Sequence, residues 1–291
     1  MSEGSKPIAY GMYLAVFLDL LGHRELYAKI ADIPPETTPE RAAFTEHVVE
    51  FIRQIHYLKL DVERFFEGYD SHESDLPWPD EMAEFRQKMS RHVCKIQRFS
   101  DGLVIFVPLQ DDREHFPISS VYRALGGAAL VMLNSLARGS PVRGGIAVGG
   151  GVELDERELF GPVVGMAYEL ESSVAQYPRI AVHPSVMKYV RSHTTIPEPQ
   201  TNDEKYLKMM GQLCSGMIEQ DIDGVPILHY LGEAIWGGIL SHGGDPLLER
   251  AREFAATSLR RFQEAGSSKL AVRYLLLNNY LDAHDPTTSG Q

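Results

Sequence analysis

The stretch Arg98-Phe99-Ser100-Asp101-Gly102-Leu103-Val104-Ile105-Phe106-Val107 joins two apolar, β-prone runs at Ser-Asp-Gly. With Cys94-Lys95-Ile96-Gln97 ahead of it, the segment alternates apolar and polar residues up to Ser-Asp-Gly and is continuously apolar afterwards. This pattern is typical of a hairpin that enters a buried sheet. It predicts a hairpin over residues 94–108 with the Asp101 carboxylate at the tip of a tight turn. Asp-Gly is a common turn dipeptide, so Asp101 alone is more often a turn former than a ligand.

A second carboxylate changes the interpretation of the first. The stretch Tyr13-Leu14-Ala15-Val16-Phe17-Leu18-Asp19-Leu20-Leu21-Gly22 places Asp19 inside an otherwise apolar strand. An ionised Asp is costly to bury unless a positive charge lies on it. The sequence offers no obvious Arg or Lys partner, so we expect Asp19 and Asp101 to hold a metal ion together.

Composition limits the class of protein. The chain has 291 residues, 44% of them hydrophobic, which allows a sizeable core. Its formal net charge of -12 argues against binding to nucleic acid or to an anionic membrane surface, and a polyanionic substrate would need a counter-cation or local donors. Only Cys94 and Cys214 occur, too far apart for a disulfide framework. The polar N-terminus and the strand-length apolar runs predict neither a signal peptide nor a membrane span, and a cytoplasmic protein fits best.

Hydrophobic periodicity predicts the elements of a catalytic core over residues 1–195. We expect strands and helices in the order strand 10–20, helix 40–67, helix 82–93, hairpin 94–108, helix 117–137, strand 143–151, helix 161–176, strand 179–182 and helix 185–192. An acidic loop interrupted by prolines is expected over residues 68–81. The glycines of the strand at 143–151 indicate either a close approach to its backbone or a bulged, tightly packed strand.

A Pro- and Thr-rich loop over residues 193–204 is the best candidate for a boundary, and a mostly helical extension, residues 196–291, is expected to pack on the core. Within the extension we expect a helix near 204–218, a strand over 225–231 and helices near 245–264 and 268–283. The order of elements in the core matches the ferredoxin-like palm, an α+β fold whose antiparallel sheet is flanked by helices. That arrangement is used for nucleotidyl transfer.

The chemistry of such a site explains the expected geometry. Two divalent cations, Mn²⁺ or Mg²⁺, would be held by Asp19, Asp101 and the backbone carbonyl of Leu20. One cation lowers the pKa of an attacking hydroxyl, and the other stabilises a pyrophosphate leaving group. Backbone N–H groups around Leu21 and Gly22 are expected to face the phosphates.

The motifs at these positions resemble those of the class III nucleotidyl cyclases. Phe17-x-Asp19-Leu20-x-Gly22 is similar to the family's first metal motif, and Phe99-Ser100-Asp101 is similar to its hairpin Ile-Gly-Asp. Arg143-x-Gly145-Ile146-x-x-Gly149 resembles the family's Arg-x-Gly-Ile-His-x-Gly strand, and Phe160-Gly161-x-x-Val164-x-x-Ala167-x-x-Leu170-Glu171 resembles its late helix. The resemblance covers roughly residues 10–190, with four motifs in the family's order.

The departures from the family bear on specificity. Gly165 and Glu169 stand where the family has an Asn and an Arg that contact ribose and triphosphate; Arg143, Arg157 and Arg24 are speculative replacements. Gln97 stands where adenylate cyclases carry a base-reading Lys and guanylate cyclases a Glu, and the second base-reading position falls at about Glu158. Neither purine pattern is present.

A compact stand-alone core with a helical extension resembles the bacterial pyrimidine cyclases of Pycsar anti-phage defence, which convert UTP or CTP to a 3′,5′-cyclic monophosphate that signals to an effector. The resemblance implies a homodimer in which each site combines groups from both subunits. An amide at Gln97 permits uracil or cytosine, and UTP is favoured only because uridylate cyclases are the commoner group. The alternatives are a cytidylate cyclase, a purine cyclase with a different base-reading shell, and a non-enzymatic nucleotide-binding module.

Overall fold

The computed structural model describes residues 9–72, 93–110, 116–154, 158–237 and 244–286. The expected helix over 82–93 therefore lies almost wholly outside the described residues, as does Arg157. The expected acidic loop over 68–81 is wrong at its start, because the long helix α2 (Glu40–His72) continues through residues 68–72. The remainder of that loop lies outside the described residues.

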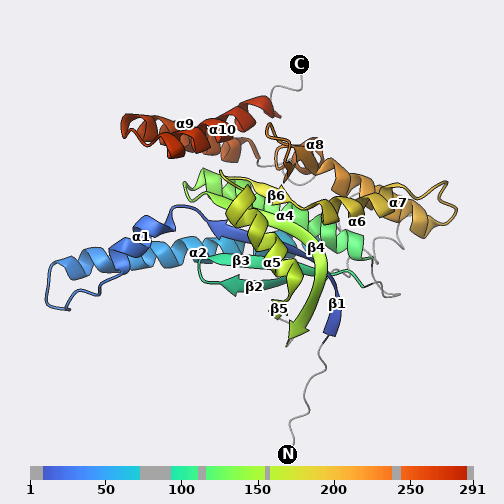
Figure 1. The fold of residues 1–291 in the computed structure, drawn as a ribbon, viewed down its shortest axis with the longest axis horizontal. Coiled ribbons are helices and arrows are strands. Elements are labelled where there is room, and N and C mark those ends of the chain that lie inside the picture. Colours follow the sequence, from blue (N-terminus) through green and yellow to red (C-terminus); the bar gives the residue numbers. More distant parts are fainter. Residues whose placement is uncertain (1–8, 73–92, 111–115, 155–157, 238–243, 287–291) are drawn as a thin grey trace, which may run out of the picture.

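The centre of the structure is one sheet in which the described residues form eight strands (Figure 1). Their order is β2-β3-β1-β4-β6-β8-β7, and β5 pairs with β4 off this path. All pairs are antiparallel except β4 with β6. The strands are β1 (Ala9–Leu20), β2 (Lys95–Phe99), β3 (Gly102–Pro108), β4 (Val142–Leu154), β5 (Glu158–Phe160), β6 (Ile180–Val182), β7 (Ile218–Gln220) and β8 (Pro226–Leu228). The fold class, an α+β structure with a sheet flanked by helices, is as expected.

Helices cover both faces of this sheet (Figure 1). α2 and α4 (Pro117–Ala137) pack on one face, and α5 (Pro162–Glu169) packs on the other. The helix α5 continues into a π-helical turn, η2 (Leu170–Val174). The other helices are α1 (His23–Ile30), α6 (Pro184–Thr194), α7 (Asn202–Gly216), α8 (Glu233–Trp236), α9 (Gly244–Glu264) and α10 (Ser268–Ala283). None of the helices in the described ranges has the length and apolar character needed to cross a membrane.

Strict alternation along β1 decides which residues face the site. Leu14, Val16 and Leu18 are fully buried in the core beneath α4, whereas Tyr13 and Phe17 belong to the smaller cluster beneath α5. Because successive side chains of a strand point to opposite faces, Asp19 continues the series of residues on the α5 side. The candidate site is therefore built on that face.

The glycines of β4 allow α5 to pack directly on the sheet. A Cβ atom at Gly145 would lie 2.1 Å from the carbonyl oxygen of Ala167, and one at Gly144 would lie 2.5 Å from the carbonyl oxygen of Phe17. Any side chain at either position would clash with backbone. The close approach expected at this strand is therefore made, at Gly145, by a helix of the chain itself.

The segment after residue 196 adds to the same sheet. Ile227 of β8 pairs with Ala181 of β6, and β7 pairs with β8 at the edge. The buried guanidinium of Arg179 forms ion pairs with Asp221 and Asp223, which lie between β7 and β8. The helices α9 and α10 form a pair, and α9 packs on α4. The expected helices 245–264 and 268–283 are confirmed, whereas β5, β7 and α8 were not expected.

Candidate functional site

The end of β1 and the turn between β2 and β3 lie together at one end of the sheet. Asp19 is paired in register with Gly102, the residue after Asp101. Ser100 adopts a left-handed φ of 45°, which closes the turn tightly. A Cβ atom at Gly102 would lie 2.6 Å from the carbonyl oxygen of Leu18 and 3.5 Å from Asp19 Oδ1. Glycine at position 102 therefore lets the strand that carries Asp19 approach the turn that carries Asp101.

Both carboxylates affect the pKa of one tyrosine hydroxyl, that of Tyr27. Tyr27, on α1, has its hydroxyl 3.3 Å from Ser100 Oγ. Burial is the main cause that raises the pKa of Tyr27, and the hydrogen bond with Ser100 lowers it. Asp101 raises this pKa further through its charge and a hydrogen bond, and Asp19 raises it through its charge. The Tyr27 hydroxyl thus lies beside Asp101 and within the electrostatic influence of Asp19.

Asp19 has a basic partner that the sequence did not suggest. Arg143 lies directly opposite Asp19 in the register of β1 and β4, and its Nη2 atom is 3.9 Å from Asp19 Oδ2. The same guanidinium forms an ion pair through Nε with Glu171 of η2. The expectation that Asp19 lacks an Arg or Lys partner is wrong, because that partner comes from a strand far away in the sequence.

Glu171 is the most deeply buried carboxylate at this end of the described sheet, with 1% of the residue exposed. Burial raises its pKa to about 7; the Arg143 charge opposes this shift, and the charge of Asp19 and a hydrogen bond with Asp19 add to it. The carboxylates of Asp19 and Glu171 therefore share the Arg143 guanidinium, and the Asp101 carboxylate lies at the adjacent turn beside Tyr27.

The backbone after β1 is only partly as expected. Leu20 is buried and pairs with Val142. The N–H group of Leu21 donates a hydrogen bond to the carbonyl oxygen of Pro141 at 2.8 Å, so the expectation that this group faces phosphate is wrong for this structure. Gly22 has a left-handed φ of 91° and precedes the first residue of α1, with open space where a Cβ would stand.

Gln97 contacts the backbone of β5, the strand that also carries Glu158. Gln97, on β2 and 9% exposed, accepts a hydrogen bond at Oε1 from the backbone N–H of Leu159 at 2.8 Å. Glu158 is the exposed neighbour of Leu159 on β5. Gly165 and Glu169, in contrast, lie on the exposed side of α5, and a Cβ atom at Gly165 would meet open space.

Two residues of the cluster were not identified from the sequence as parts of the site. Glu171 lies in the Leu170-Glu171 pair of the late-helix motif, and this pair was the available signal. Tyr27 lies in a short helix with no motif and gives no signal in the sequence. Both reach the site through tertiary packing alone.

Comparisons with known proteins give little further information. No protein-family model matches the chain, and no curated protein matches it. Among solved structures, the chain is similar to the crystal structure of the adenylyl cyclase CyaB from P. aeruginosa, with 15% sequence identity and a TM-score of 0.38. The match covers 64% of this chain and 84% of that chain. A likeness of this size supports no inference about activity, which must come from the residues of the site.

Proposed function

We propose that the chain is a metal-dependent nucleotidyl cyclase that converts UTP to 3′,5′-cyclic UMP and pyrophosphate. The observation that carries this proposal is the register of β1 with β3, which places Asp19 at the end of β1 directly opposite Gly102, the residue after Asp101 in the β2–β3 turn. The four sequence motifs that resemble class III cyclases supply the reaction class.

The donor atoms of the cluster fit divalent cations. Asp19 and Glu171 share the Arg143 guanidinium and Asp101 lies at the adjacent turn, so this end of the sheet carries an excess of acidic groups that Mg²⁺ or Mn²⁺ would balance. Oxygen ligands are those that these hard cations prefer. Asp19, Asp101 and the backbone carbonyl of Leu20 would hold two such ions, which when bound lower the pKa of a hydroxyl and stabilise charge on phosphate oxygens.

In the proposed reaction the 3′ hydroxyl of the ribose loses its proton and its oxygen bonds to the α-phosphorus. The bond from that phosphorus to the α,β-bridging oxygen breaks, and pyrophosphate leaves. Arg143 shares its charge between Glu171 and Asp19 and so keeps the Asp19 carboxylate in position. Arg143 is thus a positioning residue, whereas Asp19 and Asp101 are the proposed ligands.

Hydrogen-bonding capacity at β5 supports uracil over cytosine. The Oε1 atom of Gln97 already accepts from Leu159, which directs its amino group, a donor, toward other partners. The neighbouring Glu158 carboxylate is an acceptor. A donor beside an acceptor complements the O4 and N3–H groups of uracil, whereas cytosine presents the reverse pattern of N4–H₂ and N3.

We further propose a homodimer, because the resembling family combines metal-binding and base-reading groups from two subunits. The exposed Gly165 and Glu169 do not offer the donors that the family uses for ribose and triphosphate. We also propose, on the resemblance to Pycsar cyclases, that the product serves as a second messenger in anti-phage defence. A cytidylate cyclase is the nearest alternative.

The test incubates the purified chain and Mn²⁺ with each of the four labelled nucleoside triphosphates and resolves the products. We expect cyclic UMP and pyrophosphate from UTP, lost in Asp19→Asn and in Asp101→Asn and retained in Asp282→Asn, a control at an exposed position of α10. Turnover of CTP alone, or of ATP or GTP alone, would overturn the choice of uracil. No turnover of any nucleotide, with binding still measurable by calorimetry, would favour a nucleotide-binding module.

A further inference from the structure

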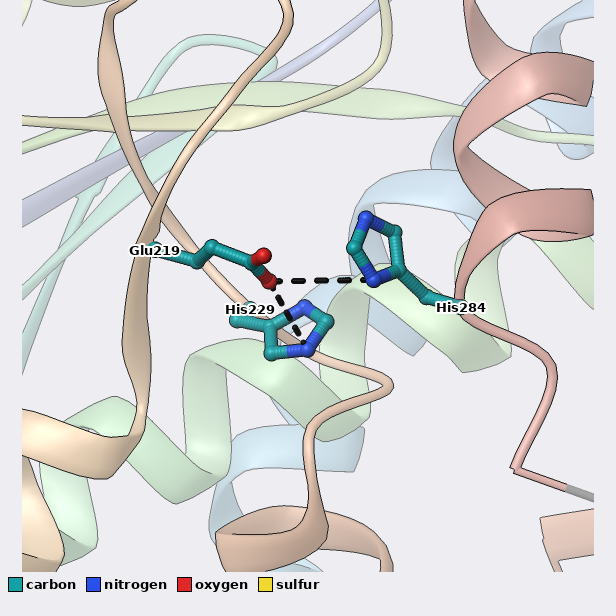
Figure 2. A group of neighbouring side chains, drawn as sticks. All are labelled: Glu219, His229 and His284. Atoms are coloured by element: carbon teal, nitrogen blue, oxygen red, sulfur yellow. Dashed lines mark ion pairs between the residues drawn. The ribbon is translucent and has the colours of Figure 1, made fainter. Parts of the chain in front are cut away.

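A second cluster lies at the opposite edge of the sheet (Figure 2). Glu219 of β7, His229 just after β8 and His284 at the C-terminal end of α10 point toward one another. Within the described ranges of the chain, this is the only group of three or more His, Cys, Asp or Glu side chains whose ligand atoms all lie within 4.8 Å of one another. The strands β4, β6 and β8 separate β7 from β1, so the cluster is distinct from the site at Asp19.

The ring of His229 is held in a fixed orientation. Its Nδ1 atom is 3.0 Å from the hydroxyl of the buried Tyr280, which also accepts a hydrogen bond from the backbone N–H of Leu231. Gly232 leaves room for the ring, since a Cβ there would lie 2.4 Å from His229 Cδ2. The other nitrogen, Nε2, is thereby directed at Glu219. In metal-ligating histidines, an outer hydrogen bond at one ring nitrogen orients the ring so that the other nitrogen can face the metal.

A hydrogen bond to Glu219 explains the position of only one of the two histidines, His229. His229 Nε2 lies 3.0 Å from Glu219 Oε2, which is hydrogen-bond distance. His284 Nδ1 lies 3.7 Å from the same oxygen, which is too far for a hydrogen bond. The two imidazole rings nevertheless lie with their centroids 4.5 Å apart, an arrangement that two charged rings would disfavour.

We propose that Glu219, His229 and His284 bind one Zn²⁺ ion. Four ligands at about 2.0–2.1 Å around a tetrahedral Zn²⁺ lie about 3.3 Å from one another. The distances of 3.0 Å and 3.7 Å from Glu219 to the two histidines lie on either side of this value. Two imidazoles and one carboxylate favour zinc over the hard cations proposed at Asp19, and the fourth position is open to water or another ligand.

A zinc ion at this place would join the end of the chain to the sheet. Glu219 and His229 belong to the β7–β8 hairpin at the sheet edge, whereas His284 ends the last helix. Binding energy that is gained only in the folded state stabilises that state. Zinc therefore fastens the α9–α10 pair to the core, whether or not the chain is a cyclase.

The test uses the full chain, stripped of metal with a chelator and titrated with Zn²⁺ by calorimetry, with thermal unfolding followed in parallel. We expect one Zn²⁺ per chain and a rise in Tm, and, in the Asp19→Asn variant, which lacks a ligand of the proposed Mg²⁺ site, no such rise for Mg²⁺. His284→Ala is expected to lower the affinity at least 100-fold. The matched control, His56→Ala at an exposed position of α2, is expected to bind as the unmodified chain does, as are Asp19→Asn and Asp101→Asn.

A further variant separates ligation from folding. His229→Ala also removes the contact with Tyr280, so its circular dichroism must match that of the unmodified chain before its affinity is interpreted. Tyr280→Phe keeps all three ligands and removes only the group that fixes the His229 ring, and we expect roughly a 10- to 100-fold loss of zinc affinity. No zinc binding by the unmodified chain, or unchanged binding in both His284→Ala and Glu219→Gln, would overturn the proposal.

Discussion

Arg143 lies directly across the β1–β4 ladder from Asp19, with its Nη2 atom 3.9 Å from Asp19 Oδ2 and its Nε atom paired with Glu171. One guanidinium thus serves two carboxylates from different elements. Glu171 pairs with the Nε atom of Arg143, whereas Asp19 lies 3.9 Å from Nη2, so the ion pair with Asp19 is the longer of the two.

We predict that Glu171→Gln raises the Mn²⁺ concentration needed for half-maximal cyclase activity. Without the Glu171 charge, Arg143 interacts more strongly with Asp19, and the site also loses negative charge. We expect an increase of about tenfold, equivalent to about 1.4 kcal/mol, with a smaller change in the maximal rate. Cyclase assays over a series of Mn²⁺ concentrations measure both quantities.

The control for this prediction is Glu169→Gln, two residues earlier and exposed at the end of α5. It removes the same charge from the same region, without removing a partner of Arg143. An equal increase in the Mn²⁺ requirement in both variants would contradict the assigned role of Glu171.

Local sequence patterns predicted the main elements because hydrophobic period and turn chemistry act over a few residues. The hairpin at Ser100-Asp101-Gly102 and the helix from Pro117 to Ala137 are confirmed. The short strand β7 was not expected, since three residues carry no measurable period and its pairing with β8 depends on contacts made elsewhere. The continuation of α2 through residues 68–72 was missed because the acidic composition there suggested a loop.

The site was predicted to the extent that its residues lie in motifs. Asp19 and Asp101 were identified because a carboxylate in an apolar strand and one in a tight turn are conspicuous. Their proximity to each other, and the pairing of Arg143 with Glu171, depend on strand register and helix packing. The same holds for Glu219, His229 and His284, whose spacing along the chain matches no metal-binding motif.

We predict different reactivity for the two cysteines. Burial raises the pKa of the Cys214 thiol far above its ordinary value, whereas Cys94 is half-buried and donates to the carbonyl oxygen of Ser120. A maleimide should modify Cys94 in the folded chain and Cys214 only after unfolding. Mass spectrometry of the labelled peptides measures this, with Cys94→Ser as the control; rapid labelling of Cys214 in the folded Cys94→Ser variant would contradict the packing described for α7.

We predict that Asp223→Asn lowers the free energy of unfolding at neutral pH only. A hydrogen bond from Arg179 is the main cause that holds the pKa of Asp223 below its ordinary value of 3.8. A carboxylate with a depressed pKa contributes stability above its unfolded pKa, and this contribution is lost as the pH falls through the folded pKa. Since 47% of the Asp223 side chain is exposed, we expect a deficit of at most about 1 kcal/mol.

Urea unfolding of both proteins between pH 3 and pH 7 measures this deficit. The two curves should converge at the acidic end of the range, where Asp223 of the unmodified chain becomes protonated. Asp282→Asn, at an exposed position of α10, controls for the loss of a negative charge. A deficit that stays constant down to the lowest pH would show that the substitution acts through packing instead of through the lost charge.

The last prediction separates the structural role of Gln97 from base reading. Gln97→Ala leaves the buried N–H of Leu159 without its acceptor, and we expect a loss of about 1–3 kcal/mol in the free energy of unfolding. Gln97→Glu keeps an acceptor for Leu159 but removes the amino donor. If the donor reads O4 of uracil, Gln97→Glu lowers kcat/KM for UTP relative to CTP. Because the acceptor for Leu159 is kept, we expect the unfolding free energy of Gln97→Glu to be nearer that of the unmodified chain than the unfolding free energy of Gln97→Ala is. An unchanged ratio of UTP to CTP turnover in Gln97→Glu would assign Gln97 to holding β5 alone, because the proposed donor to O4 would then be absent without effect.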